Sequence, residues 1–231
     1  TTTISDIVIT GANQSEVEEF KLDQYAVLTG VGDASIDDVT VGDITITLGN
    51  GGIVRDFDFS QDATVSGTGD ASVGARTIGD ISITVGDGGG VSDLSIKADA
   101  DVTGEGNASV GILNVGDVTL LAGDGVQTMD VQFRHAASVS GTGNASVGNV
   151  TIGDLSMIAG DSGDINDFEV YVKADVDGTG DALVGNVTIG NVLFISGDSG
   201  SGSIDLTIDV SAQADIGNAT IGNVVVGDIS I

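Results

Sequence analysis

The heptapeptide Gly67-Thr68-Gly69-Asp70-Ala71-Ser72-Val73 returns along the chain every 37 residues. Related copies begin at Gly30, Gly104, Gly141 and Gly178, and each keeps both glycines of the Gly-x-Gly step and the Asp or Asn after it. A fixed period of this length is typical of repeat architectures, in which each repeat buries its apolar face against its neighbours. The sequence therefore predicts an elongated molecule.

The repeats fill the whole chain. Full repeats span residues 30–66, 67–103, 104–140, 141–177 and 178–214. Residues 1–29 match the back of the repeat, and residues 215–231 match its beginning. We therefore expect a single repeat array over residues 1–231, with no separate domain at either end.

Each repeat combines two sequence patterns. The first is a rhythm of apolar, Ser or Thr, apolar, Gly, and Asn or Asp, as in Ala145–Asn149 and Val150–Asp154. Its three extended residues predict a short strand, and we expect the Gly and its Asn or Asp to supply positive φ angles at a corner or bulge. The second pattern is the alternation of Phe168–Val176, which predicts a strand of about nine residues with one buried and one wet face.

Apolar residues one repeat apart form columns. Two of them are Ile4, Val41, Ile78, Val115, Ile152, Ile189 and Val226, and Ile7, Ile44, Ile81, Val118, Leu155, Val192 and Ile229. Such columns favour an all-β solenoid, in which each side chain stacks on its copy ~4.8 Å along the axis. An antiparallel β-sandwich or barrel is the alternative, with the Gly-Asn and Gly-Asp steps as bulges. Two smaller turns per 37-residue repeat are a further arrangement.

The composition limits partners and compartment. Thirty-five acidic and six basic residues give a net charge of −29, which repels nucleic acid and anionic lipid. No stretch is long enough to insert into a membrane. The chain has no Cys, which excludes a disulfide scaffold and does not decide the compartment. It begins at Thr1 without Met, which fits a matured, exported product. We expect an extracellular or cell-surface protein whose partners are cations, matrix components or copies of itself.

Acidic columns make calcium the candidate ligand. One column contains Asp43, Asp80, Asp117 and Asp154, and a second contains Asp87, Asp124, Asp161 and Asp198. Carboxylates one coil apart repel each other unless they splay into water or hold a cation between them. Calcium accepts carboxylate and carbonyl oxygens in flexible, glycine-rich loops. The other interpretation is that these residues form turns and keep the surface hydrated.

Nothing in the sequence indicates catalysis. His135 is the one histidine, and Gln61, Ala98 and Val172 take its place in other repeats. Without a second His or any Cys, neither a nucleophile–base pair nor a transition-metal site has its usual residues. We expect a protein that is not an enzyme and that needs no cofactor other than Ca²⁺.

The two ends of the chain carry the same part of the repeat. Ile4, Ile7 and Ile9 near the start correspond to Val226, Ile229 and Ile231 at the end, and neither segment has the polar character of a cap. A contact between the end of one molecule and the start of the next does not close, so it generates a fibre. We expect a secreted structural protein that assembles head to tail into a filament or surface layer. The alternative function is a monomeric, calcium-dependent adhesin or matrix-binding module.

Overall fold

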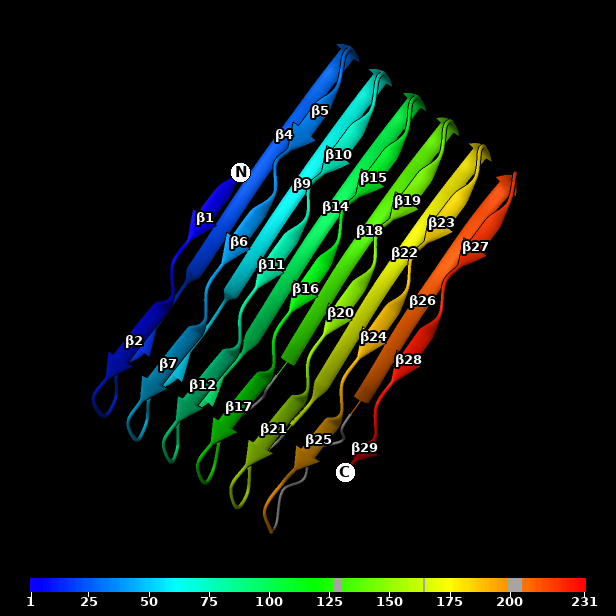
Figure 1. The fold of residues 1–231 in the computed structure, drawn as a ribbon. Helices are drawn as coiled ribbons and strands as arrows, with labels where there is room; N and C mark the ends of the chain where they lie inside the picture. The colour runs from blue at the N-terminus through cyan, green and yellow to red at the C-terminus, as the bar shows by residue number, and fades with distance from the viewer. Residues whose placement is uncertain (127–129, 164, 199–204) are drawn as a thin grey trace.

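The chain forms a parallel β-solenoid of about six coils, with one 37-residue repeat per coil. The computed structural model describes residues 1–126, 130–163, 165–198 and 205–231. Each described strand pairs in parallel with the equivalent strand of a neighbouring coil, as Ile81 pairs with Ile44 and with Val118. The antiparallel alternative is therefore wrong, and so is the arrangement with two turns per repeat. Figure 1 shows the coils side by side from the first to the last.

A long sheet forms one side of the coil. Its strands have 12 or 13 residues, more than the nine expected, because pairing continues into the Gly-x-Gly step (Gly104 with Gly67, for example). The strands of the long sheet are β4 (Phe20–Val31), β9 (Phe57–Thr68), β14 (Asp93–Glu105), β18 (Asp130–Thr142), β22 (Asp167–Thr179) and β26 (Asp205–Ile216).

Three narrow sheets bring the chain back opposite the long sheet, and we call them the first, second and third return sheets. The first contains β5 (Ala34–Ile36), β10 (Ala71–Val73), β15 (Ala108–Val110), β19 (Ala145–Val147), β23 (Ala182–Val184) and β27 (Ala219–Ile221). The second contains β1 (Thr2–Ile4), β6 (Val39–Val41), β11 (Arg76–Ile78), β16 (Leu113–Val115), β20 (Val150–Ile152), β24 (Val187–Ile189) and β28 (Val224–Val226). The third contains β2 (Ile7–Gly11), β7 (Ile44–Leu48), β12 (Ile81–Val85), β17 (Val118–Ala122), β21 (Leu155–Ala159), β25 (Val192–Ile195) and β29 (Ile229–Ser230).

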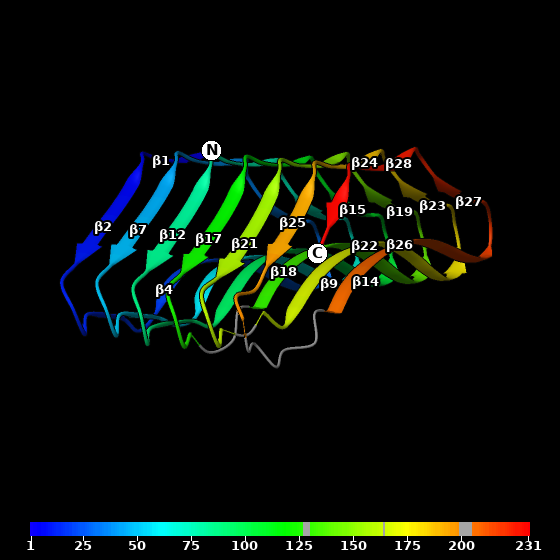
Figure 2. The same cartoon turned by 90° about the horizontal axis from the view of Figure 1, so that it is seen from below.

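A glycine loop follows the third return sheet and closes the coil. Beyond it the first three coils contribute β3 (Glu16–Val17), β8 (Ile53–Val54) and β13 (Gly90–Val91) to a short sheet. Figure 2 shows the flattened cross-section, with the return strands on one side and the long strands on the other. Over the described residues, the structure has no helix that is long and apolar enough to cross a membrane.

The core is a thin layer of stacked aliphatic and Phe side chains between the two sides. Alternate residues of each strand point inward, so Ile44, Ile46 and Leu48 of β7 are buried while Thr47 is exposed. Phe20 and Phe57, one coil apart, stack with their ring centroids 4.8 Å apart. Burial of apolar surface in every coil is the main stabilising contribution, at about 25 cal/mol per Å². The predicted columns are thus the core.

The glycines of the repeat serve two different purposes. The Gly-x-Gly glycines, such as Gly67 and Gly69, have φ near +140° to +150°, which suits a residue without Cβ. The glycines of the Gly-Asp and Gly-Asn steps, such as Gly79 and Gly153, are absent from the positive-φ positions of the described chain. The expectation of positive φ at these steps is wrong. A Cβ on Gly79 would overlap the Asp43 carboxylate of the previous coil, so close approach requires glycine there.

The last full repeat carries a one-residue slip in its register. Asp167 pairs with Asp205, one residue beyond the usual spacing, and the regular register returns between Val176 and Thr179. Ala182 then pairs with Ala219 at the normal spacing. The long sheet absorbs the extra residue while the return sheets keep their register.

Candidate functional site

Asp and Asn side chains form hydrogen-bonded ladders along the corners of the solenoid. In each rung, the side-chain Oδ1 of one coil accepts a hydrogen bond from the backbone N–H of the equivalent residue one coil later, as Asp43 does from Asp80 at 3.0 Å. The rungs measure 2.7 to 3.3 Å. The rungs satisfy backbone donors at places where the chain leaves one sheet for the next.

Among the described residues, four such ladders run parallel to the axis. Ladder I contains Asp33, Asp70, Asn107, Asn144, Asp181 and Asn218. Ladder II contains Asp38, Asn149, Asn186 and Asn223, and is interrupted by Ala75 and Ile112. Ladder III contains Asp6, Asp43, Asp80, Asp117, Asp154, Asn191 and Asp228. Ladder IV contains Asn13, Asn50, Asp87, Asp124, Asp161 and Asp198.

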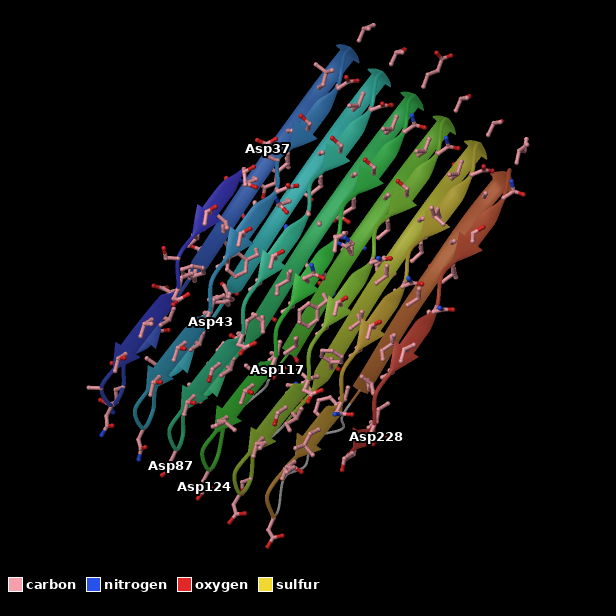
Figure 3. The ribbon with its side chains drawn as sticks, viewed as in Figure 1. Asp37, Asp43, Asp87, Asp117, Asp124 and Asp228 are labelled. Atoms are coloured by element: carbon pink, nitrogen blue, oxygen red, sulfur yellow. The ribbon has the colours of Figure 1, made fainter. Side chains whose placement is uncertain are left out.

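The residues predicted to bind calcium lie in ladders III and IV. Asp43, Asp80, Asp117 and Asp154 follow the corner between the second and third return sheets, while Asp87, Asp124, Asp161 and Asp198 follow the glycine loops. Figure 3 shows the two groups apart, with Asp87 and Asp124 at the loops and Asp43 and Asp117 along the corner. Each donates a backbone N–H to the previous coil and, except Asp198, its own Oδ1 is the acceptor of the next rung. Calcium binding by these residues stays a prediction.

The ladders bring like charges close together. Asp80, Asp117 and Asp154 are consecutive rungs with exposed side chains. A pair of unit charges about 4 Å apart in water repels by about 1 kcal/mol, and salt screens this repulsion. Asn at the next rung, Asn191, keeps the acceptor without the charge. The rung therefore requires an oxygen, and the charge is a separate property.

A buried polar chain, which the sequence analysis did not identify, crosses the core of the first three coils. The Arg76 side chain is 2 % exposed; its Nε donates to Gln61 Oε1 at 2.9 Å and its Nη1 to the Phe59 carbonyl at 3.1 Å. Gln61 donates to Gln24 Oε1 at 2.8 Å, and Gln24 donates to Thr2 Oγ1 at 3.3 Å. Burial lowers the pKa of Arg76 to about 10. The sequence holds one indication of this burial, because the residues equivalent to Arg76 in the neighbouring repeats are the apolar Val39 and Leu113.

His135 is a core residue. Its side chain is 1 % exposed, its Nε2 lies 2.8 Å from the Gly111 carbonyl, and its Nδ1 has no hydrogen-bond partner in the described structure. Burial lowers the pKa of His135 to about 4, so the ring is neutral at pH 7. Among the described residues, no hydrogen bond joins the His135 ring to an acidic or basic side chain.

The predicted assembly residues lie on the two end faces of the solenoid. Ile4 of β1 and Ile7 and Ile9 of β2 belong to the first coil, and their strands are edge strands. Val226 of β28 and Ile229 of β29 lie at the opposite edges of the same two sheets, and Ile231 follows β29. The Ile229 side chain is 49 % exposed. Ile231 is 77 % exposed, whereas Phe194, its equivalent one coil earlier, is buried.

The ladders give the two end faces opposite hydrogen-bonding character. Each Oδ1 accepts from the following coil, so Asn218, Asp228 and Asp198 carry the last side-chain acceptors of their ladders within residues 1–231. At the near end, Asp6 and Asn13 are the first residues of their ladders within residues 1–231, and their backbone N–H groups occupy the donor position. One end face thus presents ladder donors and the other presents ladder acceptors.

No protein-family model matches this sequence, and neither a curated protein nor a solved structure matches it.

Proposed function

We propose that this protein is a structural subunit that stacks head to tail into an extracellular filament or surface layer. The observation that carries the proposal is that the two end faces are the two halves of the coil-to-coil contact repeated inside the chain. The first coil offers the lower face of that contact and the last coil offers the upper face. A second copy can therefore continue the solenoid without a new kind of interface.

Matching register supports this contact in four sheets. A following copy would set its β1 on β28, β2 on β29, β4 on β26 and β5 on β27, because each pair belongs to opposite edges of one sheet. Thr2 of the following copy would then pair with Val224, in the same way as Thr2 pairs with Val39 within the chain. Strand addition usually occurs at unpaired strand edges that carry apolar side chains.

The ladder ends support the same polarity. In a head-to-tail junction Asn218 meets Asp33, Asp198 meets Asn13 and Asp228 meets Asp6, each as acceptor and donor. Only the last of these pairs brings two carboxylates together. A junction of two far ends would instead oppose acceptor to acceptor. The acidic surface suits a salt-rich medium, where screening allows such rods to approach.

Two proline variants test the proposal, because each blocks one end without breaking a bond inside the chain. Thr2 N–H donates to Asp38 at 2.9 Å and Ile4 accepts from Gly42, so the intervening Thr3 amide points away from the second coil. At the other end Asn223 accepts from Val187 and Gly227 donates to Ile189, so the Val224 amide points outward. Thr3→Pro and Val224→Pro each remove one outward donor at an edge, where proline is tolerated.

The readout is particle size by analytical ultracentrifugation and negative-stain imaging of the 231-residue chain. We expect filaments from the unmodified chain, monomers from either proline variant alone and dimers from their mixture. Thr3→Ala and Val224→Ala keep the amide and are the matched controls, which should assemble. Dimers of one proline variant alone would contradict the head-to-tail contact. A chain that stays monomeric at high concentration would contradict the proposal as a whole.

A further inference from the structure

The outer face of the third return sheet changes from polar to apolar along the axis. One outward column has Thr on β2, β7 and β12 and an aliphatic residue on β17, β21 and β25. In chain order its members are Thr10, Thr47, Thr84, Leu121, Ile158 and Ile195. Ile158 is partly exposed, whereas Met157 and Ala159 on either side of it are buried. Neighbours in a column are ~4.8 Å apart, so Leu121, Ile158 and Ile195 form a continuous surface, which we call the apolar strip.

A row of carboxylates borders the apolar strip on each side. Asp117 and Asp154 of ladder III come directly before β17 and β21, and Asp124, Asp161 and Asp198 of ladder IV follow β17, β21 and β25. All five side chains are exposed. Figure 3 shows Asp117 and Asp124 toward the two ends of β17. Residues 117–124, 154–161 and 191–198 contain no Lys, Arg or His, so no basic side chain within these segments neutralises the carboxylates.

Negative charge and apolar character increase together along this face. Ladder IV has Asn13 and Asn50 beside the Thr part of the column, and it has Asp in every coil from Asp87 onward. Asn13 and Asn50 form the same rung as the Asp residues do, so stacking of the coils does not require the charge. An aliphatic strip with added carboxylates along its border is typical of a surface that contacts a partner of opposite charge.

We propose that the apolar strip and its two acidic borders bind a basic amphipathic helix of a partner protein. The apolar face of that helix lies on the strip, and Lys or Arg along both edges of the face contact the carboxylates. Asp124 comes seven positions after Asp117, so the two acidic rows are within ~20 Å of each other at about 3.3 Å per residue. A helix about 10–12 Å across fits between the rows, and long basic side chains reach them from its edges. The net charge of −29 favours the approach of such a partner.

The probe for this surface is a synthetic peptide of Leu and Lys, with Leu on one helical face and Lys at both edges of that face. It has about 15 residues, the length at which an isolated helix begins to form. Its binding is measured by fluorescence anisotropy in 150 mM KCl. The protein is the full chain with both Thr3→Pro and Val224→Pro, so that end-to-end assembly does not change the signal. The same peptide with Glu in place of Lys should not bind, because both acidic rows repel it.

Three substitutions test the apolar contact. Ile158→Thr should weaken binding of the Lys peptide about fivefold, and the fold tolerates it because Thr84 occupies the same column. Thr84→Leu extends the strip onto β12 and should strengthen binding severalfold. Leu183→Ser is the matched control with unchanged affinity, because it removes an exposed aliphatic side chain from the first return sheet, where Ser146 stands one coil earlier. Circular dichroism confirms the fold of each variant.

Two substitutions test the charged contact. Asp161→Asn keeps the rung to Asp198 and should weaken binding about threefold, because it removes one carboxylate from the border of the strip. Asp70→Asn in ladder I also keeps its rung, to Asn107, and removes the same charge from another corner of the coil. It is the matched control, with unchanged affinity.

Three results would overturn the proposal. An equal loss of affinity in Asp161→Asn and Asp70→Asn would assign the binding to the overall negative field. Unchanged affinity in both Ile158→Thr and Thr84→Leu would show that the peptide does not contact the strip. Self-association of the double proline variant that Ile158→Thr abolishes would assign the strip to a second copy of this chain. None of these results bears on head-to-tail assembly, which the single proline variants test separately.

Discussion

Asp117 Oδ1 accepts a hydrogen bond from the Asp154 backbone N–H at 2.8 Å, and the same oxygen is the nearest atom to the position that a Cβ on Gly153 would take. Glycine and Asp are thus required together, one coil apart, by a single contact. The carboxylate occupies the volume that a Cβ on Gly153 would need, and it satisfies the donor of the next residue. This relationship explains why the Gly-Asp step recurs in the repeat, and it can be tested at one rung.

Gly153→Ala should lower the free energy of unfolding by about 2 kcal/mol, because its new methyl group overlaps the Asp117 carboxylate and the backbone of Gly116. Asp117→Ala removes the overlapping carboxylate, so the double variant should be about 1 kcal/mol more stable than the sum of the single effects predicts. Urea denaturation of the four proteins measures this coupling. Strict additivity would show that the two residues do not interact.

Asp117→Asn should stabilise the protein by roughly 1 kcal/mol at low ionic strength, because it keeps the rung and removes repulsion from Asp80 and Asp154. In 1 M NaCl, where the Debye length is about 3 Å, the gain should disappear. Asp117→Ala loses the acceptor and should be about 1 kcal/mol less stable than Asp117→Asn in both conditions. Urea midpoints at two salt concentrations give the comparison. A salt-independent gain in the Asn variant would contradict the electrostatic explanation.

His135 should make the protein sensitive to mild acid. Its folded pKa of about 4 is below the value of about 6.5 in an unfolded chain, so the unfolded state binds the proton first as the pH falls. The contribution of neutral His135 to the free energy of unfolding is complete above pH 6.5 and is lost between pH 6.5 and pH 4. Between pH 7.5 and pH 5, the free energy of unfolding of the unmodified protein should fall by about 2 kcal/mol more than that of the His135→Val variant.

His135→Val is a suitable reference because Val172 occupies the same column one coil later. Burial also raises the pKa of Asp62 and Asp101, and their protonation stabilises the fold as the pH falls. That opposite effect is common to both proteins and cancels in the difference. Parallel pH profiles for the two proteins would contradict the prediction.

Gln61→Leu should lower the free energy of unfolding by about 3 kcal/mol, since it leaves the buried Arg76 guanidinium without its Gln61 acceptor. Gln61→Leu with Arg76→Leu removes both polar groups and should recover most of that loss, because Leu113 already occupies the Arg76 column. Thermal unfolding of the single and double variants measures the effect. A double variant less stable than Gln61→Leu would show that the pair itself stabilises the core.

The repeat period and the apolar columns favoured the solenoid over the antiparallel alternative, because similar apolar side chains at one spacing stack when successive repeats lie in register. Residues such as Ile44, Ile81 and Val118 were correctly assigned to one column, and all are buried. The length of the long strand was underestimated, because the Gly-x-Gly step reads as a turn in sequence although Gly67 and Thr68 still pair with the next coil. Local pattern does not reveal where pairing between coils ends.

The acidic columns were visible in the sequence, but their partners were not. A carboxylate column suggests cations, whereas the Oδ1 atoms along ladder III accept backbone N–H groups, and a backbone donor has no signature in sequence.

The uniform step between coils makes the length of this molecule a countable quantity. Duplication or loss of one 37-residue unit in the gene would lengthen or shorten the rod by ~4.8 Å while leaving every type of neighbouring contact as it was. The slip that ends at Thr179 shows that even an added residue is confined to one side of one coil. Evolution can therefore change the length of this protein in fixed increments of one coil.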